Sequence, residues 1–231
     1  MQPQFATMNR DTALTNTFLG RVYGWMFVGL SLTALVAFGV AASPDLLAIL
    51  FHNPLLFWGA IIAEFILVFA LSSRVQNMAP AVATGFFLLY AALNGLTLSL
   101  VLLAYTGASV AGTFVITAGM FGAMALYGAT TRRNLAGMGA YLFMALIGLI
   151  LASVVGWFWH SSVLQIVISV AGVLIFTGLT AYDAQRLKTM ALSQPGDRTT
   201  SYTIVGALAL YLDFLNLFLF LLQLFGRRSN N

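Results

Sequence analysis

Cysteine is absent from this chain of 231 residues, and charged residues are scarce. The lack of cysteine excludes disulfides, thiol chemistry and thiolate metal sites. Charged residues make up 7% of the chain, whereas a typical soluble domain has about 25%. Hydrophobic residues reach 61%. These proportions indicate an integral membrane protein.

The motifs of common enzymes and of nucleotide-binding sites are also missing. There is no Walker motif, no His-Glu-x-x-His and no Gly-x-Ser-x-Gly, and no polar segment is long enough to house an ATP site. We therefore expect no enzymatic activity and no cofactor. The net charge of +4 comes mostly from basic residues in short connections, where they report topology rather than binding to nucleic acid.

Apolar runs divide the chain into seven segments of the length that crosses a bilayer, which is about 20 residues. Turn residues such as Pro44, Pro80, Gly107 and Pro195 stand between them. The sequence thus predicts an all-α polytopic membrane protein with a single transmembrane domain at 22–226. It is preceded by an N-terminal segment, 1–21, and followed by a tail, 227–231. The seven predicted spans are 22–42, 55–73, 80–103, 109–128, 137–159, 162–184 and 203–225.

The distribution of Lys and Arg predicts the orientation of these spans. With seven spans, most basic residues fall on the side of the N-terminus, and only Arg227 and Arg228 fall on the other side. By the positive-inside rule the N-terminus is cytoplasmic and the C-terminus is outside. A re-entrant last segment would instead bring every basic residue inside. The basic residues on the N-terminal side are Arg10, Arg21, Arg74, Arg132, Arg133, Arg186, Lys188 and Arg198.

Ionisable groups within the apolar segments are the candidate functional residues, because a charge in a membrane span is costly and usually functional. Asp183 stands near the cytoplasmic end of the sixth predicted span, and Asp213 lies within the seventh. Glu64 lies in the middle of the second span, and Arg74 ends the same span about 15 Å away. Arg74 can therefore extend to the interface without a partner.

The depths of Asp183 and Asp213 allow the two carboxylates to meet. Two carboxylates in a site of low dielectric constant cannot both ionise easily, so such a pair would share one proton and loosen when pH rises. Arg74 or Arg186 could instead pair with an aspartate and favour its charged form. A third reading is that Tyr, Asn or Thr side chains only satisfy each aspartate by hydrogen bonds.

Glycine and the weaker polar residues have ordinary interpretations. Pairs such as Gly20 with Gly24, and Gly119 with Gly122, predict close approach of helices. His52 and His160 are more typical of interfacial residues than of metal ligands, and no metal site can be assigned. Polar side chains within the spans could line a pathway or join helices by hydrogen bonds; they are Asn94, Asn216 and Gln223.

Two motifs near the C-terminus give the chain a family resemblance. Gly178-Leu-Thr-Ala-Tyr-Asp183-Ala-Gln and Ala207-Leu-Ala-Leu-Tyr-Leu-Asp213-Phe-Leu-Asn-Leu-Phe resemble the Bax inhibitor (TMBIM) family. Arg21-Val-Tyr-Gly-Trp and Thr117-Ala-Gly-Met-Phe-Gly-Ala-Met support the resemblance, which covers essentially the whole chain and points to a bacterial member.

The resemblance implies a seven-helix fold with the last helix central, in a bacterial inner membrane. It also implies a pH-sensitive calcium leak channel in which Asp183 and Asp213 share a proton and hold the pore closed. Arg74 matches an arginine that can latch onto the sixth-helix aspartate, and Glu64 matches a glutamate along the ion path. The expected partners are the lipid bilayer, calcium or other cations, and a membrane protein.

Two other functions remain open from the sequence. The first is a non-conducting regulator that binds a membrane protease or a stress factor. The second is an intramembrane aspartyl protease, which Tyr182-Asp183 followed by Asp213 superficially matches. Such proteases carry Gly-x-Gly-Asp at the second aspartate, whereas this chain has Leu210-Tyr-Leu-Asp213. Carboxylates suit protons as well as calcium, so the residues do not identify the ion.

Overall fold

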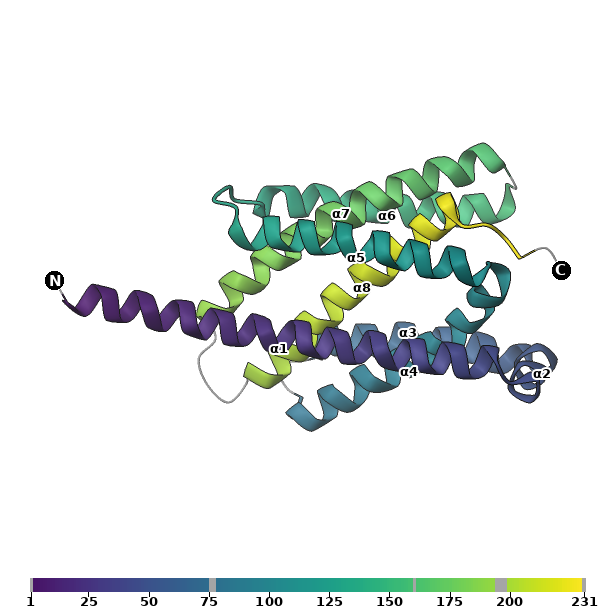
Figure 1. Cartoon of the computed structure of the whole chain (residues 1–231), viewed down its shortest axis with the longest axis horizontal. Helices are drawn as coiled ribbons and strands as arrows, with labels where there is room; N and C mark the ends of the chain where they lie inside the picture. The colour runs from purple at the N-terminus through teal and green to yellow at the C-terminus, as the bar shows by residue number, and fades with distance from the viewer. Residues whose placement is uncertain (1, 75–77, 160, 194–198, 230–231) are drawn as a thin grey trace. The chain divides into compact units, whose positions relative to one another are not determined.

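The computed structural model of the chain describes residues 2–74, 78–159, 161–193 and 199–229. These residues form helices joined by short connections, and seven of the helices are long and apolar enough to cross a membrane, as the hydropathy predicts (Figure 1). The helices are α1 Gln2–Ala41, α2 Pro44–His52, α3 Pro54–Arg74, α4 Pro80–Ala104, α5 Gly107–Thr130, α6 Ala136–Phe158, α7 Ser162–Ser193 and α8 Thr199–Phe225.

The helices differ most from the predicted spans at three places. The first helix begins at Gln2 rather than at residue 22, and its apolar part is Ala13–Ala41. A short helix, α2, follows where only a turn was predicted. The sixth span was predicted to end at residue 184, but α7 continues to Ser193 because neither glycine nor proline occurs between Gly178 and Pro195.

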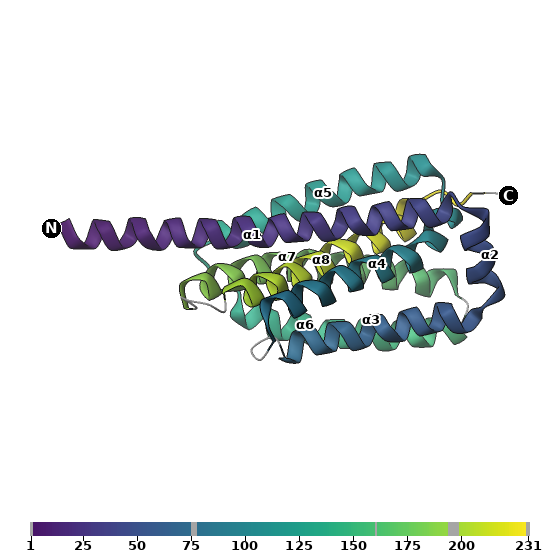
Figure 2. The ribbon, with the colours of Figure 1, turned by 90° about the horizontal axis from the view of Figure 1, so that it is seen from below.

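The described residues divide into two compact units. Unit 1 consists of Met1–Tyr105, Met190–Tyr211 and Ser229–Asn231, and unit 2 consists of Thr106–Thr189 and Leu212–Arg228. In unit 1, α4 packs against α1 and against α3 (Figure 2). A Cβ atom on Gly95 of α4 would lie 2.6 Å from the carbonyl oxygen of Thr33, so this glycine allows α1 and α4 to approach closely.

In unit 2, α7 packs against α5 and α6. A Cβ on Gly128 of α5 would overlap the carbonyl oxygen of Ala181, and a Cβ on Gly139 of α6 would overlap the ring of Tyr182. The sequence predicted close approach of helices at two pairs of glycines, and this prediction is wrong for both pairs. A Cβ at any of them would meet no described atom within 4 Å; they are Gly20, Gly24, Gly119 and Gly122.

The last helix, α8, is the most buried of the seven. In its most apolar stretch 67% of the residues are buried, against 11% to 39% in the other spans. Its first half belongs to the core of unit 1, where Tyr211 is fully buried, and its second half belongs to the core of unit 2. The prediction of a central last helix is confirmed, since a helix that is apolar on all sides must be buried on all sides.

Candidate functional site

Asp183 lies on α7 just before the predicted end of the sixth span, and the helix continues past it to Ser193. Arg186, one helical turn further on, places its Nη1 atom 3.8 Å from Asp183 Oδ1. Spacings of three residues bring side chains to the same face of a helix, so the pair follows from the local sequence. The Arg186 side chain is 59% exposed and that of Asp183 is 15% exposed, which means that solvent partly screens this ion pair.

Asp213 lies on the second half of α8 and is only 4% exposed. The neighbouring Phe214 makes edge-to-face contacts with Phe114 and Phe121 of α5, with ring centroids 5.3 Å and 5.5 Å apart. These aromatic contacts fix the rotation of α8 in unit 2. Among the described residues, Asp213 Oδ2 is buried without a hydrogen-bond partner, so Tyr, Asn or Thr hydrogen bonds do not fully satisfy Asp213. The same reading for Asp183 stays a prediction.

The two aspartates belong to the same unit and lie close enough for their carboxylates to interact electrostatically. Asp183 has a guanidinium group beside it, whereas Asp213 has a buried oxygen with no partner. An unpaired charge at a buried position costs several kcal/mol, and a neutral carboxyl group costs much less. The arrangement can therefore hold a proton and respond to its loss.

Side chains near the end of α7, which sequence reasoning missed, form hydrogen bonds with the end of α5 and with the connection between α5 and α6. Gln185 Oε1 accepts a hydrogen bond from the Leu135 N–H, and Gln185 Nε2 donates one to the Arg133 carbonyl oxygen, both at 2.8 Å. Lys188 Nζ donates to the Ala129 carbonyl oxygen at 2.9 Å. The backbone groups that Gln185 and Lys188 bond lie about fifty residues or more away along the chain, so no local sequence pattern predicts these bonds. They anchor the segment that carries Asp183.

Glu64 takes part in a separate polar cluster in unit 1. Thr97 Oγ1 of α4 donates a hydrogen bond to Glu64 Oε1 of α3 at 3.0 Å and lies at the same distance from the Asn94 carbonyl oxygen. The amide nitrogen of Asn94, Nδ2, is buried without a partner among the described residues. Glu64 is therefore partly buried and joined to a neighbouring helix.

A second set of polar contacts joins α1, α4 and α8 in unit 1. The hydroxyl groups of Thr33 and Tyr211 lie 2.7 Å apart, and Thr33 Oγ1 also reaches the Ala91 carbonyl oxygen at 2.8 Å. Both side chains are almost fully buried. Each of these partners comes from a different helix, so the contact joins three helices. No sequence pattern predicts this contact.

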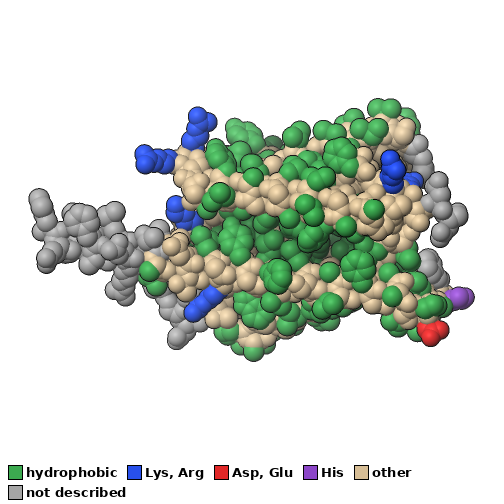
Figure 3. All heavy atoms as spheres, viewed as in Figure 1, with side chains coloured by type: hydrophobic (Ala, Val, Ile, Leu, Met, Phe, Trp, Pro, Cys, Tyr) green, Lys and Arg blue, Asp and Glu red, His purple; other side chains and the backbone are tan. Residues whose placement is uncertain are grey.

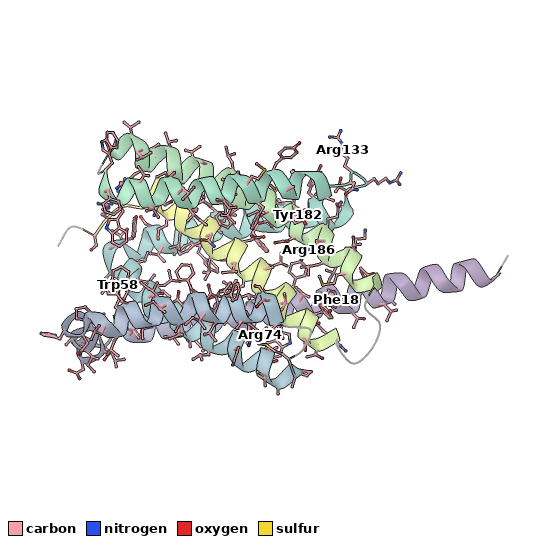
Figure 4. The ribbon with its side chains drawn as sticks, turned by 180° about the vertical axis from the view of Figure 1, so that it is seen from behind. Phe18, Trp58, Arg74, Arg133, Tyr182 and Arg186 are labelled. Carbon is pink, nitrogen blue, oxygen red and sulfur yellow. The ribbon has the colours of Figure 1, made fainter. Side chains whose placement is uncertain are left out.

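Other predicted residues have separate places. Arg74 ends α3 with an exposed side chain (Figure 4), and its role as a latch stays a prediction. Gln223 Oε1 accepts a hydrogen bond from Ser169 of α7, whereas Asn216 donates within its own helix. His52 bonds a carbonyl oxygen of its own helix, and His160 lies outside the described residues. No group of three or more metal-ligating side chains occurs in the described part of the chain.

Comparison with known proteins gives matches over nearly the full length. The family model described as "Inhibitor of apoptosis-promoting Bax1" matches residues 15–230. The chain is 50% identical to the inner membrane protein YbhL of Escherichia coli strain K12, over 98% of each protein. It is 42% identical to an "Uncharacterized protein" of Deinococcus radiodurans, over 99% of this chain and 98% of the relative. An "Uncharacterized membrane protein" of Streptococcus pyogenes serotype M1 is 40% identical, over 93% of this chain and 94% of the relative.

Proposed function

This chain belongs to the Bax inhibitor family, and from that premise we propose that it is a pH-sensitive calcium leak channel of a bacterial inner membrane. Asp183 and Asp213 share a proton that holds the channel closed. The observation that carries the proposal is the buried carboxyl oxygen of Asp213, which has no partner among the described residues and belongs to the same unit as Asp183. The placement in an inner membrane rests on the name of the Escherichia coli relative.

The sign of the pH dependence follows from the two surroundings. Arg186 favours the charged form of Asp183, and burial favours the neutral form of Asp213. Below the pH at which the shared proton is lost, the pair carries at most one negative charge and stays together. When pH rises and the proton is lost, two like charges face each other in a site of low dielectric constant. The repulsion loosens the contact between α7 and α8, and flux increases.

Glu64 is the candidate charge along the pathway. Calcium takes six to eight oxygen ligands and prefers carboxylates and carbonyl oxygens, and carboxylates in a pore attract cations. Glu64, the hydroxyl of Thr97 and the carbonyl of Asn94 supply oxygens of this kind in one cluster of unit 1. Arg74, whose side chain is exposed at the end of α3, remains the candidate latch.

The proposal is tested by measuring calcium flux through the purified full-length protein in liposomes across a pH series. We expect flux that rises with pH. Folded protein that conducts no calcium at any pH would overturn the channel and favour the non-conducting regulator. Cleavage of a membrane-embedded peptide that stops when either aspartate is replaced would favour the protease instead.

Substitution of the two aspartates tests the shared proton. Asp183→Asn and Asp213→Asn should each change the pH dependence of the flux, and the double variant should behave nearly like one single variant, because residues that titrate as one unit are not additive. Asp45→Asn, at an exposed position in α2, is the matched control and should leave the profile unchanged. Fully additive effects would show that the carboxylates titrate separately, and the shared-proton gate would be dropped.

A further inference from the structure

Two consecutive arginines in the connection between α5 and α6 differ from the other basic residues of unit 2 nearby. Lys188 is bonded to the Ala129 carbonyl oxygen and Arg186 is paired with Asp183. Arg132 and Arg133 are exposed, and within the described residues neither side chain has an ion pair or hydrogen bond. Figure 4 shows Arg133 projecting away from the helices. These two guanidinium groups are therefore available to a ligand.

The backbone that carries the two arginines is fixed. Gln185 holds the carbonyl of Arg133 and the N–H of Leu135. Thr131 Oγ1 accepts from the Arg133 N–H at 3.3 Å, and Asn134 Oδ1 accepts from the Ala136 N–H at 2.9 Å. A fixed backbone lowers the conformational entropy that binding would cost. The backbone of the connection therefore holds the two arginines in place before a ligand binds.

Exposed apolar side chains flank the two arginines on both helices. Leu126 and Tyr127, in the last turn of α5, are 65% and 44% exposed. Tyr141, in the second turn of α6, is 76% exposed. Tyrosine is enriched where a membrane meets water, because its ring is apolar and its hydroxyl group is polar. Figure 3 shows basic side chains that project beside hydrophobic ones at one end of the helices.

We propose that Arg132 and Arg133 bind the phosphate of an anionic phospholipid, with its acyl chains lying along the exposed apolar side chains of α5 and α6. Guanidinium groups match phosphate oxygens with paired hydrogen bonds. The two helices are membrane spans that end at Thr130 and begin at Ala136, so the connection lies where lipid headgroups lie. A soluble acidic partner would gain nothing from the apolar flanks, and a lipid uses both parts of the surface.

A matched control pair exists at the other end of the same unit. Arg227 and Arg228 are also consecutive and exposed, and the N–H of Arg227 bonds Ser109 in the first turn of α5. The helix of 24 residues between the two pairs separates them by about 36 Å. The carbonyl oxygen of Arg227 also accepts a bond from the Thr106 N–H. Replacing either pair removes the same charge, so any difference reports the site.

The experiment is native mass spectrometry of the purified full-length protein with phosphatidylglycerol and phosphatidylcholine in equal amounts. We expect one phosphatidylglycerol molecule to be retained in preference to phosphatidylcholine. Arg132→Gln with Arg133→Gln should weaken this binding about 30-fold, from the usual contribution of two basic residues at a membrane surface. Arg227→Gln with Arg228→Gln should leave it unchanged. Thermal unfolding of each variant checks that the fold persists.

Three outcomes would overturn the proposal. Equal losses in the two double variants would mean that only overall charge attracts the lipid. Equal retention of the two lipids would mean that the site does not distinguish an anionic headgroup from a zwitterionic one. Displacement of the bound lipid by inorganic phosphate at the same concentration would mean that the site takes phosphate alone and that the acyl chains add nothing.

Discussion

Asp183 and Asp213 have identical side chains, but their surroundings differ. One has an arginine within 3.8 Å, and the other is 4% exposed with an oxygen that has no partner among the described residues. Pairs of titratable groups whose environments push them apart often divide the roles of charge and proton carrier. In the proposed gate, Asp183 is the fixed charge and Asp213 is the carrier of the proton.

Replacing Arg186 tests this division. Arg186→Gln removes the group that favours the charged form of Asp183, so the loss of the shared proton should need a higher pH. We expect the pH midpoint of calcium flux in liposomes to rise by less than about one unit, because an exposed ion pair contributes about 0.2–1 kcal/mol. Arg186→Lys keeps the charge and should shift the midpoint less. A midpoint that moves to lower pH would contradict the assignment.

Replacing Glu64 tests the pathway independently of the gate. Glu64→Gln removes a charge that attracts cations while keeping the size of the side chain, and Thr97 can still donate to it. Calcium flux should fall while the pH midpoint stays nearly unchanged, and Glu64→Asp should retain more flux. An unchanged rate would remove Glu64 from the pathway, and a moved midpoint would place it in the gate.

The sequence identifies the intramembrane acids but not their partners. Hydropathy is enough to find Asp183, Asp213 and Glu64, because any charge within an apolar run stands out. Arg186 could be foreseen from helical spacing. Thr97 and Gln185 could not, since their bonds join helices whose rotation and contact are set by packing.

Only some of the glycines allow two helices to approach closely. Two variants in α5 can test this difference. Gly128→Ala would place a Cβ atom against the Ala181 carbonyl oxygen of α7, whereas Gly122→Ala meets no described atom within 4 Å. We expect Gly128→Ala to lower stability by about 1–3 kcal/mol. Gly122→Ala should be neutral or slightly stabilising, because alanine favours helix. Thermal unfolding in detergent measures both, and equal melting temperatures would contradict the described contact.

The helix ends show what hydropathy misses. α2 has nine residues, which is too short for a window that detects spans. Its signal was nevertheless present, because Ser43 caps the helix through the Leu46 N–H, Pro44 begins it and Asp45 lies in its first turn. The extension of α7 lacks such a marker, since polar residues such as Gln185 and Lys188 interrupt the apolar run without ending the helix.

The whole molecule has a predicted orientation that cysteine labelling can test, and the absence of native cysteine gives a clean background. We expect Ser43→Cys to react with an impermeant maleimide from outside the cell and Asn134→Cys to react only from inside, from the distribution of Lys and Arg. A C-terminal reporter should be external. A cytoplasmic reporter would contradict seven full crossings and support the re-entrant last segment.

The fold class and the number of spans could be predicted from composition and hydropathy alone, because a bilayer requires long apolar helices. The division into two units could not. Nothing in the sequence of α8 marks the step from Tyr211, in unit 1, to Leu212, in unit 2, since the helix is apolar and continuous there. Which neighbours each half meets depends on contacts between distant segments.

The burial of α8 has a consequence for how the protein is made. The ribosome synthesises α8 after the seven other helices, yet both units draw part of their core from it. During translation the earlier helices therefore enter the bilayer with faces that have no protein to cover them, and lipid must cover them instead. Assembly of either unit waits for the last span to be inserted. The core of each unit is thus completed only after α8 has been made, in contrast to domains that fold in the order of their synthesis.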